Sequence, residues 1–525
     1  MGIYFNPGNE SFKSDTRSRI YVDKTGLLEI LNKRIGSAEK CIALSHARRF
    51  GKSQAAGMID AYYSLGSDSA ELFAPYAIAR EPDFREHLNK YNVIHLDISS
   101  FTDNFRDNVV EKIIEYLYDD FREEVTDIDY NKSINAVLAQ IYRKTGDSFV
   151  IIIDEWDCII RNRAENHTLV HEYLQFLHTL FKSEESKSFL ALGYITGILP
   201  IKKIKDESAL NNFKEYTMVK SGEFTPFFGF TEDEVKALCK KYSMEFESVK
   251  QWYDGYRISG IDMYNPNSVY QAMVDHDLDS YWKNTSAFGT INTYITMNYD
   301  GLKDDVMAML EGKKVHLNTA KFGNDLSEIH SKDDALTALI HLGYLAYDDG
   351  KAYIPNYEVS LAYRLALQDS GWNEVARAID RCEELLDETI EGNEERVAEI
   401  IDLAHEAYTS VLKYNDENAL SCVITMAYFT APAYYNVIRE LPAGKGFADI
   451  VMLPRKDTKN KPPLLIELKY DKDADSAIRQ IHEKRYTGAL AGCNDEIIIV
   501  GINYDKDRKE HSCRIERMGD SLISV

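Results

Sequence analysis

The feature that most constrains the fold of this chain is an apolar, β-branched run that ends abruptly in acid. Residues 148–157 read SFVIIIDEWD. Such a continuous run is typical of a strand buried on both faces of a parallel sheet, because a strand with one exposed face shows alternating polar residues. Similar apolar runs at 41–45, 92–100 and 189–197 alternate with segments of helical periodicity. This alternation predicts a parallel α/β sheet in the N-terminal part.

The loop after the predicted strand at 41–45 carries a phosphate-binding pattern. Residues 46–53, HARRFGKS, lead directly into a segment of helical periodicity. A P-loop needs backbone N–H groups at a helix N-terminus, a lysine for phosphate and a hydroxyl for Mg²⁺. Gly51, Lys52 and Ser53 supply them. His46 stands where the first glycine of the motif usually lies, so the motif is incomplete at that position.

Polar residues at the ends of the other predicted strands complete this candidate site. Asp154 is placed to hold Mg²⁺ through water, and Glu155 to orient and deprotonate the attacking water. The alternative is that both acids only cap the strand end. Thr196, at the end of the run at 189–197, is a candidate sensor of the γ-phosphate or a hydrogen-bonded strand-end threonine. Arg49 and its neighbour Arg48 either contact phosphate or form a solvated loop.

A second candidate site lies near the C-terminus, on the two predicted strands GFADIVMLP and PLLIELKY. Asp449 lies on the first strand, and Glu467 and Lys469 project from one face of the second because they are two residues apart. Clustered carboxylates with a lysine are what metal-dependent phosphodiester cleavage requires. Gln480, on the following helix, and Glu417, on a preceding one, are candidate further members. A buried structural ion pair or a solvated strand face is the alternative.

Composition narrows the class of protein. The 525 residues suggest two to four domains, and 44% hydrophobic with 28% charged residues is the balance of a folded soluble protein. We expect a cytoplasmic protein without a membrane partner, because the sequence shows no signal peptide and no stretch of about 20 apolar residues. The seven cysteines form no CxxC pair, which disfavours a zinc ribbon or a disulfide framework.

The charge is unevenly distributed. The net charge of −24 argues against a surface that binds polyanions everywhere, but Arg439–Ala489 holds 11 Lys/Arg against 8 Asp/Glu. The secondary-structure pattern changes near residue 227 from alternating strands and helices to mainly helical segments, and a different α/β pattern follows later. We therefore divide the chain into an N-terminal P-loop AAA-like ATPase domain (1–226), a mainly helical region that is compatible with a winged element (227–370), and a helical lead-in with a C-terminal α/β domain (371–525).

Several longer motifs resemble a known family. YVDKT, ARRFGKS, IIIDEWD, FGFTEDEV, WYDGYR and YNPNSV resemble the bacterial AAA-ATPase-like family, and the ending GKGFADIVMLP…LLIELKY…QIHEKRY resembles its C-terminal PD-(D/E)XK nuclease-superfamily domain. The resemblance implies a restriction-endonuclease-like fold for residues 371–525. Its other implications are ATP and Mg²⁺ at Lys52, Ser53, Asp154 and Glu155, and a nuclease centre at Asp449, Glu467 and Lys469 with Gln480 as auxiliary. Trp252, Tyr253 and Tyr256 of WYDGYR fit packing better than base stacking.

These expectations favour an ATP-binding, ATP-hydrolysing protein coupled to a nuclease that uses Mg²⁺, with Mn²⁺ as an alternative ion. Its expected partner is nucleic acid, DNA ahead of RNA, and a homo-oligomer is compatible with the sequence. Two alternatives stay open at this point. One is a nucleotide-dependent switch or scaffold whose nuclease-like domain binds a partner without cleaving it, and the other is an ATPase that remodels proteins.

Overall fold

The computed structural model describes residues 2–201, 210–281, 287–297, 299–310, 312–319, 322, 329–369, 381–409, 417–428, 430–431, 434–443, 446–454, 461–484, 486 and 496–518. The chain divides into two compact units. The first comprises residues 1–249, 253–281 and 316–355, and the second comprises residues 250–252, 282–315 and 356–525. We describe each unit by itself. The predicted domain boundaries at 226/227 and 370/371 stay predictions.

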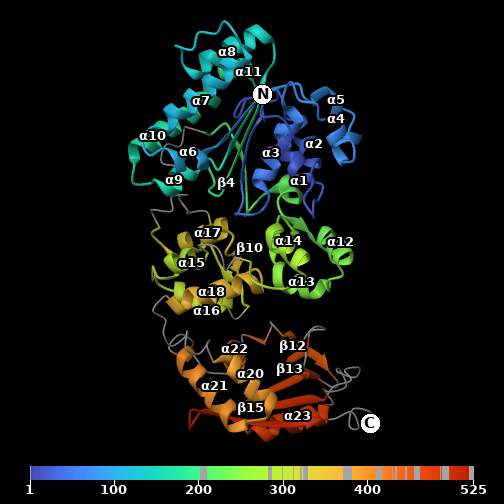
Figure 1. Ribbon diagram of the computed structural model, residues 1–525. Helices are drawn as coiled ribbons and strands as arrows, with labels where there is room; N and C mark the ends of the chain where they lie inside the picture. Colours follow the sequence, from blue (N-terminus) through green and yellow to red (C-terminus); the bar gives the residue numbers. More distant parts are fainter. Residues whose placement is uncertain are drawn as a thin grey trace. The chain divides into compact units, whose positions relative to one another are not determined.

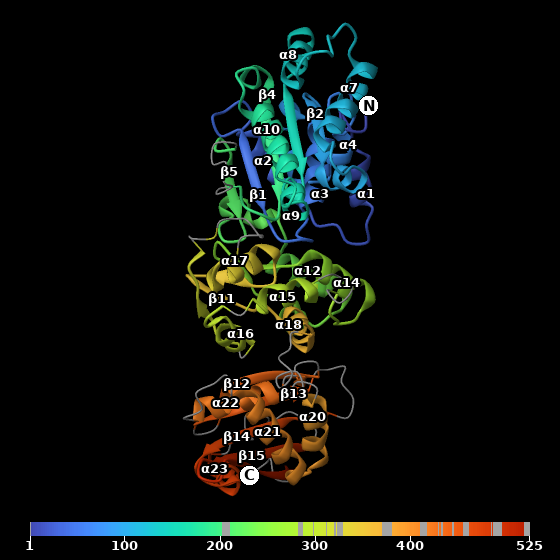
Figure 2. The ribbon, with the colours of Figure 1, turned by 90° about the vertical axis from the view of Figure 1, so that its left-hand side faces the viewer.

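A five-stranded sheet forms the centre of the first unit (Figures 1 and 2). Its order is β2-β3-β4-β1-β5, and every neighbouring pair is parallel. The strands are β1 (Cys41–Ser45), β2 (Asn92–Asp97), β3 (Phe149–Asp154), β4 (Leu190–Gly197) and β5 (Lys214–Thr217). The predicted parallel α/β sheet is confirmed. The edge strand β5 was not predicted, because its sequence KEYT is short and mostly polar.

Helices cover both faces of this sheet and bury two separate cores (Figure 1). The first face carries α6 (Ile98–Asn104), α7 (Val109–Glu124), α8 (Ile134–Thr145), α9 (Cys158–Asn162), α10 (His167–Lys182) and α11 (Ser186–Phe189). The second carries α1 (Glu10–Thr16), α2 (Gly26–Asn32), α3 (Lys52–Tyr63), α4 (Ala70–Phe73), η1 (Ala77–Arg80), α5 (Phe84–His87) and η2 (Gly222–Phe227). Burial on both faces explains why β1, β3 and β4 are almost entirely apolar up to their polar C-terminal ends.

The rest of the first unit consists of short strands and helices. A three-stranded sheet in the order β6-β8-β7 is followed by α14. The segment predicted as a winged element forms the hairpin β10–β11 after α17, with β9 as its third strand. The elements are β6 (Phe230–Thr231), α12 (Glu232–Tyr242), α13 (Phe246–Tyr253), β7 (Tyr256–Ile258), β8 (Ile261–Tyr264), α14 (Pro266–Asp275), β9 (Val315–His316), α17 (Lys332–Leu342), β10 (Ala346–Asp348) and β11 (Lys351–Tyr353).

The second unit combines helices with a mixed five-stranded sheet in the order β12-β13-β14-β15-β16. Only β14 and β15 pair in parallel. The strands are β12 (Tyr435–Ala443), β13 (Gly446–Pro454), β14 (Leu464–Tyr470), β15 (Ile497–Asp505) and β16 (Glu510–Met518). The helices are α15 (Ala287–Ile295), α16 (Leu302–Leu310), α18 (Tyr357–Asp369), α20 (Cys382–Glu391), α21 (Glu394–Thr409), α22 (Glu417–Ala427) and α23 (Ala474–Lys484).

The predicted C-terminal α/β fold is confirmed, but two of its strands were missed. β12 and β16 are the edge strands of the sheet, and their polar, irregular sequences lack the apolar runs of β13, β14 and β15. Helix α23 packs on the face that carries Leu465 and Ile499. Among the described residues, no helix has the length and apolarity needed to cross a bilayer.

Candidate functional site

The order of the sheet explains how three polar strand ends meet. β4 lies between β1, which leads into the phosphate-binding loop, and β3, which ends at Asp154. The register pairs Leu44 with Thr196 across β1 and β4. Thr196, fully buried, donates a short hydrogen bond from its hydroxyl to Asp154 Oδ1, which also accepts the Glu155 N–H at 3.0 Å. The carboxylate of Asp154 is therefore oriented before any ligand binds.

The phosphate-binding loop ends in a helix N-terminus of the expected form. Gly51 caps α3 with φ of 88°, a left-handed conformation that glycine adopts without steric cost. Lys52 begins α3 and is buried, and its ammonium donates to the carbonyl oxygens of His46 and Ala47 at 3.0 and 2.9 Å. Burial lowers the pKa of Lys52. Ser53 is exposed at the first turn, where its hydroxyl is free of close packing.

His46, the departure from the usual motif, is packed rather than exposed. Its Nε2 lies 2.7 Å from the Ser221 hydroxyl, and its ring lies 4.9 Å from that of Phe228. Burial lowers its pKa to about 3, so the imidazole is neutral at physiological pH. The side chain thus points out of the loop, and the His46 carbonyl remains available to Lys52.

The loop arginines lie at the surface. Arg49 has a positive φ of 68° and donates from Nη1 to the Tyr281 carbonyl at 3.1 Å. Arg48 is exposed and lines the cavity described below. Their predicted contact with phosphate stays a prediction.

Glu155 does not stand free at the strand end. Its Oε2 accepts from Arg161 Nη2 at 2.7 Å, and the same guanidinium donates from Nε to Asp157 Oδ2 at 2.7 Å. Asp157 is fully buried and also accepts the backbone N–H groups of Ile198 and Leu199. Burial raises the pKa of Glu155, and the nearby Lys52 opposes that rise.

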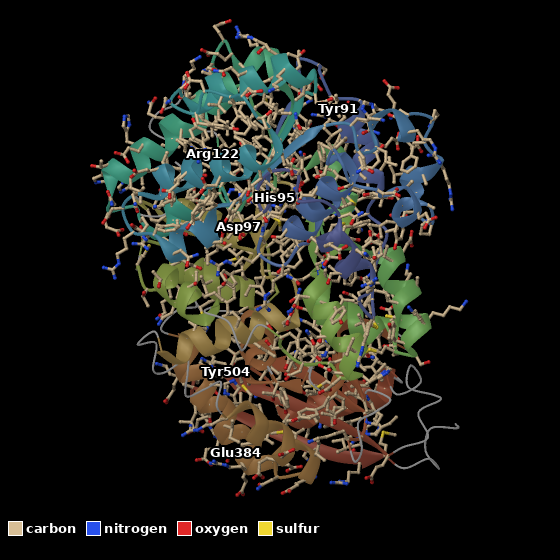
Figure 3. All side chains as sticks on the ribbon, turned by 45° about the horizontal axis from the view of Figure 1, so that its top comes forward. Tyr91, His95, Asp97, Arg122, Glu384 and Tyr504 are labelled. Carbon is tan, nitrogen blue, oxygen red and sulfur yellow. The ribbon has the colours of Figure 1, made fainter. Side chains whose placement is uncertain are left out.

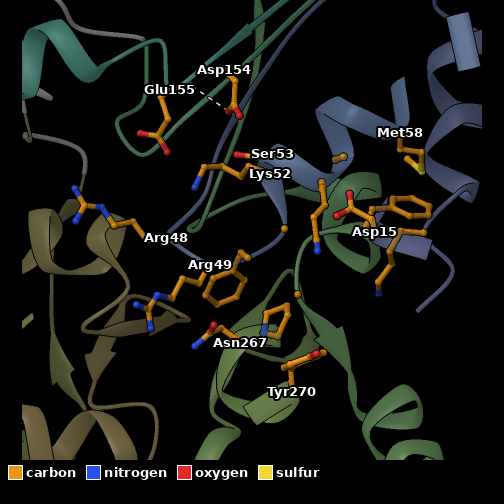
Figure 4. Close-up of a pocket in the computed structure, with 18 of the residues that line it drawn as sticks. Asp15, Arg48, Arg49, Lys52, Ser53, Met58, Asp154, Glu155, Asn267 and Tyr270 are labelled. Carbon is orange, nitrogen blue, oxygen red and sulfur yellow. Dashed lines mark hydrogen bonds between the residues drawn. The ribbon is translucent and has the colours of Figure 1, made fainter. Parts of the chain in front are cut away.

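One cavity of about 810 Å³ lies within the first unit (Figure 4). Its walls include the loop residues 48–53 together with Asp154 and Glu155. Figure 4 shows Lys52 and Ser53 at the start of α3, between the acids Asp154 and Glu155 on one side and Asn267 and Tyr270 of α14 on the other. The volume lies in the range of roughly 300–1,000 Å³ that is usual for small-molecule sites. The cavity is large enough for a nucleoside triphosphate.

The structure adds residues that the sequence reasoning missed. Asp97 ends β2 two residues after His95 (Figure 3), pairs in register with Asp154, and lines the cavity. The aspartate at the end of NVIHLD, next to the Asp154 strand, was a usable signal for it. Arg161 lines the cavity as well, but no sequence pattern marked it. Asn267 and Tyr270 belong to the YNPNSV motif and its next residue, whose role was unknown from the sequence.

The second candidate site lies where two strands of the second unit separate. β13 and β14 pair at Ile450↔Ile466 and at the next two positions, but not at Asp449 and Glu467. Instead, Asp449 Oδ2 accepts the Leu468 N–H at 2.7 Å, where a continued pairing of the strands would supply a backbone acceptor. The strand separation therefore brings Asp449 towards the carboxylate of Glu467.

Glu467 is buried among polar groups that partly satisfy it. Its Oε1 accepts from Lys469 Nζ at 2.9 Å and from the Gln480 amide in a short hydrogen bond. Its Oε2 is buried without a hydrogen-bond partner. Burial, reinforced by Asp449, raises the pKa of Glu467 to about 7. The structure thus brings together four of the predicted residues, and one buried acceptor is left for a further ligand.

Other predicted members are placed less firmly. Glu417 is the first residue of α22, and its side chain lies outside the described residues. Trp252, Tyr253 and Tyr256 are buried, which agrees with packing rather than with an open stacking platform. Within the described ranges no group of three or more His, Cys, Asp or Glu side chains is arranged to hold a metal ion.

Comparisons with known families identify both domains. Residues 8–205 match the model of the "Predicted AAA-ATPase" family, and residues 415–512 match the model of the "PD-(D/E)XK nuclease superfamily". The resemblance read from the motifs is confirmed for both.

Relatives outside these models are distant. The "Uncharacterized protein in vnfD 5'region" of Azotobacter chroococcum mcd 1 is 23% identical over 274 residues, 50% of this chain and 50% of that protein. This chain thus matches about half the length of that relative. The Walker-type ATPase paby2304 of Pyrococcus abyssi is 13% identical with a TM-score of 0.33, covering 65% of this chain and 94% of its own. The Aeropyrum pernix ORC2 protein in its ADP form is 10% identical with a TM-score of 0.31, covering 69% and 99%.

Proposed function

We propose that this chain, which carries an AAA-ATPase-like domain and a PD-(D/E)XK-superfamily domain, binds and hydrolyses ATP and cuts nucleic acid at a separate metal-dependent centre. The observation that carries the ATP part is Lys52, a buried ammonium at a helix N-terminus that donates to two loop carbonyls. The observation that carries the nuclease part is the unpartnered Glu467 Oε2 in the gap between β13 and β14.

The residues of the first cavity fit a nucleotide with Mg²⁺. Lys52 and the first backbone N–H groups of α3 would hold the phosphates, because a cation and a helix N-terminus both favour negative charge. Ser53 and Asp154 would hold Mg²⁺, which neutralises charge on the phosphates when bound. Glu155 orients the attacking water and accepts its proton, a role that its raised pKa suits. Thr196 fixes the Asp154 carboxylate.

The residues of the second site fit a divalent cation. Asp449 and Glu467 are oxygen ligands of the kind that Mg²⁺ and Mn²⁺ prefer, and burial, with Asp449 nearby, raises the pKa of Glu467. The ion supplies charge neutralisation at the scissile phosphate and a more acidic bound water. Lys469 stabilises negative charge that builds on the phosphate, and Gln480 holds the Glu467 carboxylate in place.

The test is cleavage of labelled single- and double-stranded DNA and RNA by the full chain in Mg²⁺ or Mn²⁺, with and without ATP. We expect Asp449→Asn and Lys469→Ala to abolish cleavage, and Lys52→Ala to abolish ATP hydrolysis. We also expect ATP to change the cleavage rate of the wild type but not that of Lys52→Ala. Cleavage that survives Asp449→Asn rejects the nuclease site, and cleavage indifferent to ATP and to Lys52→Ala rejects the coupling.

A second candidate function is a nucleotide-dependent switch or scaffold that binds a partner without cutting. One observation favours it: Glu467 Oε1 accepts hydrogen bonds from both Lys469 and Gln480, the arrangement of a buried structural ion pair. Intact ATP hydrolysis with no cleavage of any nucleic acid, together with unchanged partner binding in Asp449→Asn, is the result expected for that function.

A further inference from the structure

The WYDGYR motif contacts the phosphate-binding loop through Phe50. Phe50 precedes Gly51 in the loop and is fully buried. Its ring meets the ring of Tyr256 edge-on, with centroids 5.3 Å apart and planes at 87°. Its carbonyl accepts the Gly229 N–H at 3.1 Å. The residue next to Gly51 is therefore anchored on both its side chain and its backbone.

Tyr256 is itself held rigidly. Its hydroxyl donates to the Gly343 carbonyl at 2.7 Å, at the C-terminal end of α17. The preceding Gly255 has φ of +107°, and a Cβ there would lie 1.8 Å from the Pro355 carbonyl oxygen. Tyr256 thus begins β7 directly after position 255, which only glycine can occupy.

Gly229 belongs to the FGFTEDEV motif, and it too depends on the absence of a side chain. A Cβ at Gly229 would lie 3.1 to 3.2 Å from Met263, Tyr264 and Phe50. Both motifs therefore contact Phe50. Tyr256 of β7 packs against its ring, and Gly229, the residue before β6, donates its N–H to the Phe50 carbonyl. With His46 packed against Ser221 and Phe228, the loop is held at both ends by residues 221–264.

We propose that Tyr256 is a positioning residue for nucleotide binding, which acts through Phe50 to fix the N–H groups of Gly51 and Lys52 towards the phosphates. His46 supports this role, because its ring contacts Ser221 and Phe228, so residues 221–264 fix the start of the loop as well as Phe50. The segment 221–264 also lines the cavity, through Phe227, Gly229 and Phe230. A bound nucleotide therefore touches both the loop and the segment that positions it. This inference rests on the proposed binding of ATP to the cavity.

The test uses the full chain and a fluorescent N-methylanthraniloyl derivative of ATP. We expect Tyr256→Leu and Phe50→Leu each to raise the nucleotide Kd about tenfold, because each removes the aromatic contact. Tyr256→Phe keeps the ring and restores the Kd to within about threefold of the wild type. The double variant Phe50→Leu/Tyr256→Leu is no weaker than the weaker single variant, since both changes break one interaction.

Tyr363→Leu is the matched control, because Tyr363 is an equally buried ring of the other compact unit. It lowers the thermal midpoint without changing the Kd. Hydrogen exchange of a peptide covering residues 46–53 gives the second measurement, and Tyr256→Leu accelerates exchange there. An unchanged Kd and unchanged exchange in Tyr256→Leu overturn this inference alone. Absence of nucleotide binding by the wild type overturns the proposed function and the inference together.

Discussion

Arg161 bonds two carboxylates that differ in burial. It donates from Nη2 to the half-buried Glu155 and from Nε to the fully buried Asp157, each at 2.7 Å. Asp157 also receives two backbone N–H groups from the residues after β4. The guanidinium thereby connects the segment after β4, through Asp157, with Glu155 after β3, and it keeps the Glu155 carboxylate at the wall of the cavity. Its planar fork suits this double contact in a way that a lysine cannot match.

We expect Arg161→Ala to destabilise the first unit by about 3 kcal/mol or more, because it leaves Asp157 buried without its cation. Arg161→Lys keeps one of the two contacts and loses less. Arg163→Ala is the control at the same helix end, since the Arg163 side chain donates to a neutral acceptor, the Thr102 carbonyl, and its cost is about 1 kcal/mol. Denaturant unfolding measures all three. Equal losses for Arg161→Ala and Arg163→Ala contradict the structural role given to Arg161.

Thr196→Val removes the hydroxyl that orients Asp154 while keeping the shape of the side chain. We expect a loss of about 1–3 kcal/mol, because Asp154 Oδ1 keeps only the Glu155 N–H as a donor. We also expect the ATPase rate of Thr196→Val at saturating ATP to fall. Thr196→Ser keeps the hydroxyl and restores the rate. A Val variant as active as the Ser variant shows that the Thr196–Asp154 bond has no part in hydrolysis.

Two glycines in the β7–β8 region allow the steric effect of an added Cβ to be measured apart from the strain of a left-handed backbone. Gly255 and Gly260 both have positive φ, but a Cβ at Gly260 meets nothing within 4 Å, whereas one at Gly255 meets the Pro355 carbonyl at 1.8 Å. We expect Gly260→Ala to cost about 1–2 kcal/mol, the strain of the left-handed conformation alone. Gly255→Ala costs clearly more and lowers the soluble yield. Thermal unfolding of both variants checks this order, and equal midpoints refute it.

The raised pKa of Glu467 makes the second unit sensitive to pH. Its folded-state pKa of about 7 lies above its ordinary value of 4.5, so the native state holds the proton more tightly than the unfolded state. In EDTA, the stability that this proton contributes is present in full below about pH 4.5 and is lost as pH rises through 7. We therefore expect the thermal midpoint of the wild type to fall from pH 5 to pH 8 more than that of Glu467→Gln.

Metal binding reverses this dependence, because the cation requires the ionised carboxylate. Mn²⁺ affinity measured by titration calorimetry weakens as pH falls below about 7, by up to about tenfold per pH unit. A wild-type affinity that is flat between pH 5 and 8 contradicts Glu467 as a ligand.

Local patterns were enough to place the principal strands and the residues at their ends. The apolar runs of β1, β3 and β4 exist because both faces of those strands are buried, and burial on both faces favours apolar residues at successive positions. Helix α3 follows its glycine and β14 carries Glu467 and Lys469 on one face because these relations span only a few residues. The edge strands β5, β12 and β16 show no such runs, since pairing on one side permits polar sequences.

The sequence by itself determined which residues are candidates for the two sites, because Lys52, Asp154, Asp449 and Glu467 are marked by short-range spacing along single elements. The tertiary structure alone decided what those residues touch. The bond from Thr196 to Asp154 depends on β4 lying between β1 and β3, and the contact of Phe50 with Tyr256 joins positions about 200 residues apart. Sheet order and side-chain packing between distant segments are global outcomes of burial, and no spacing within one segment encodes them.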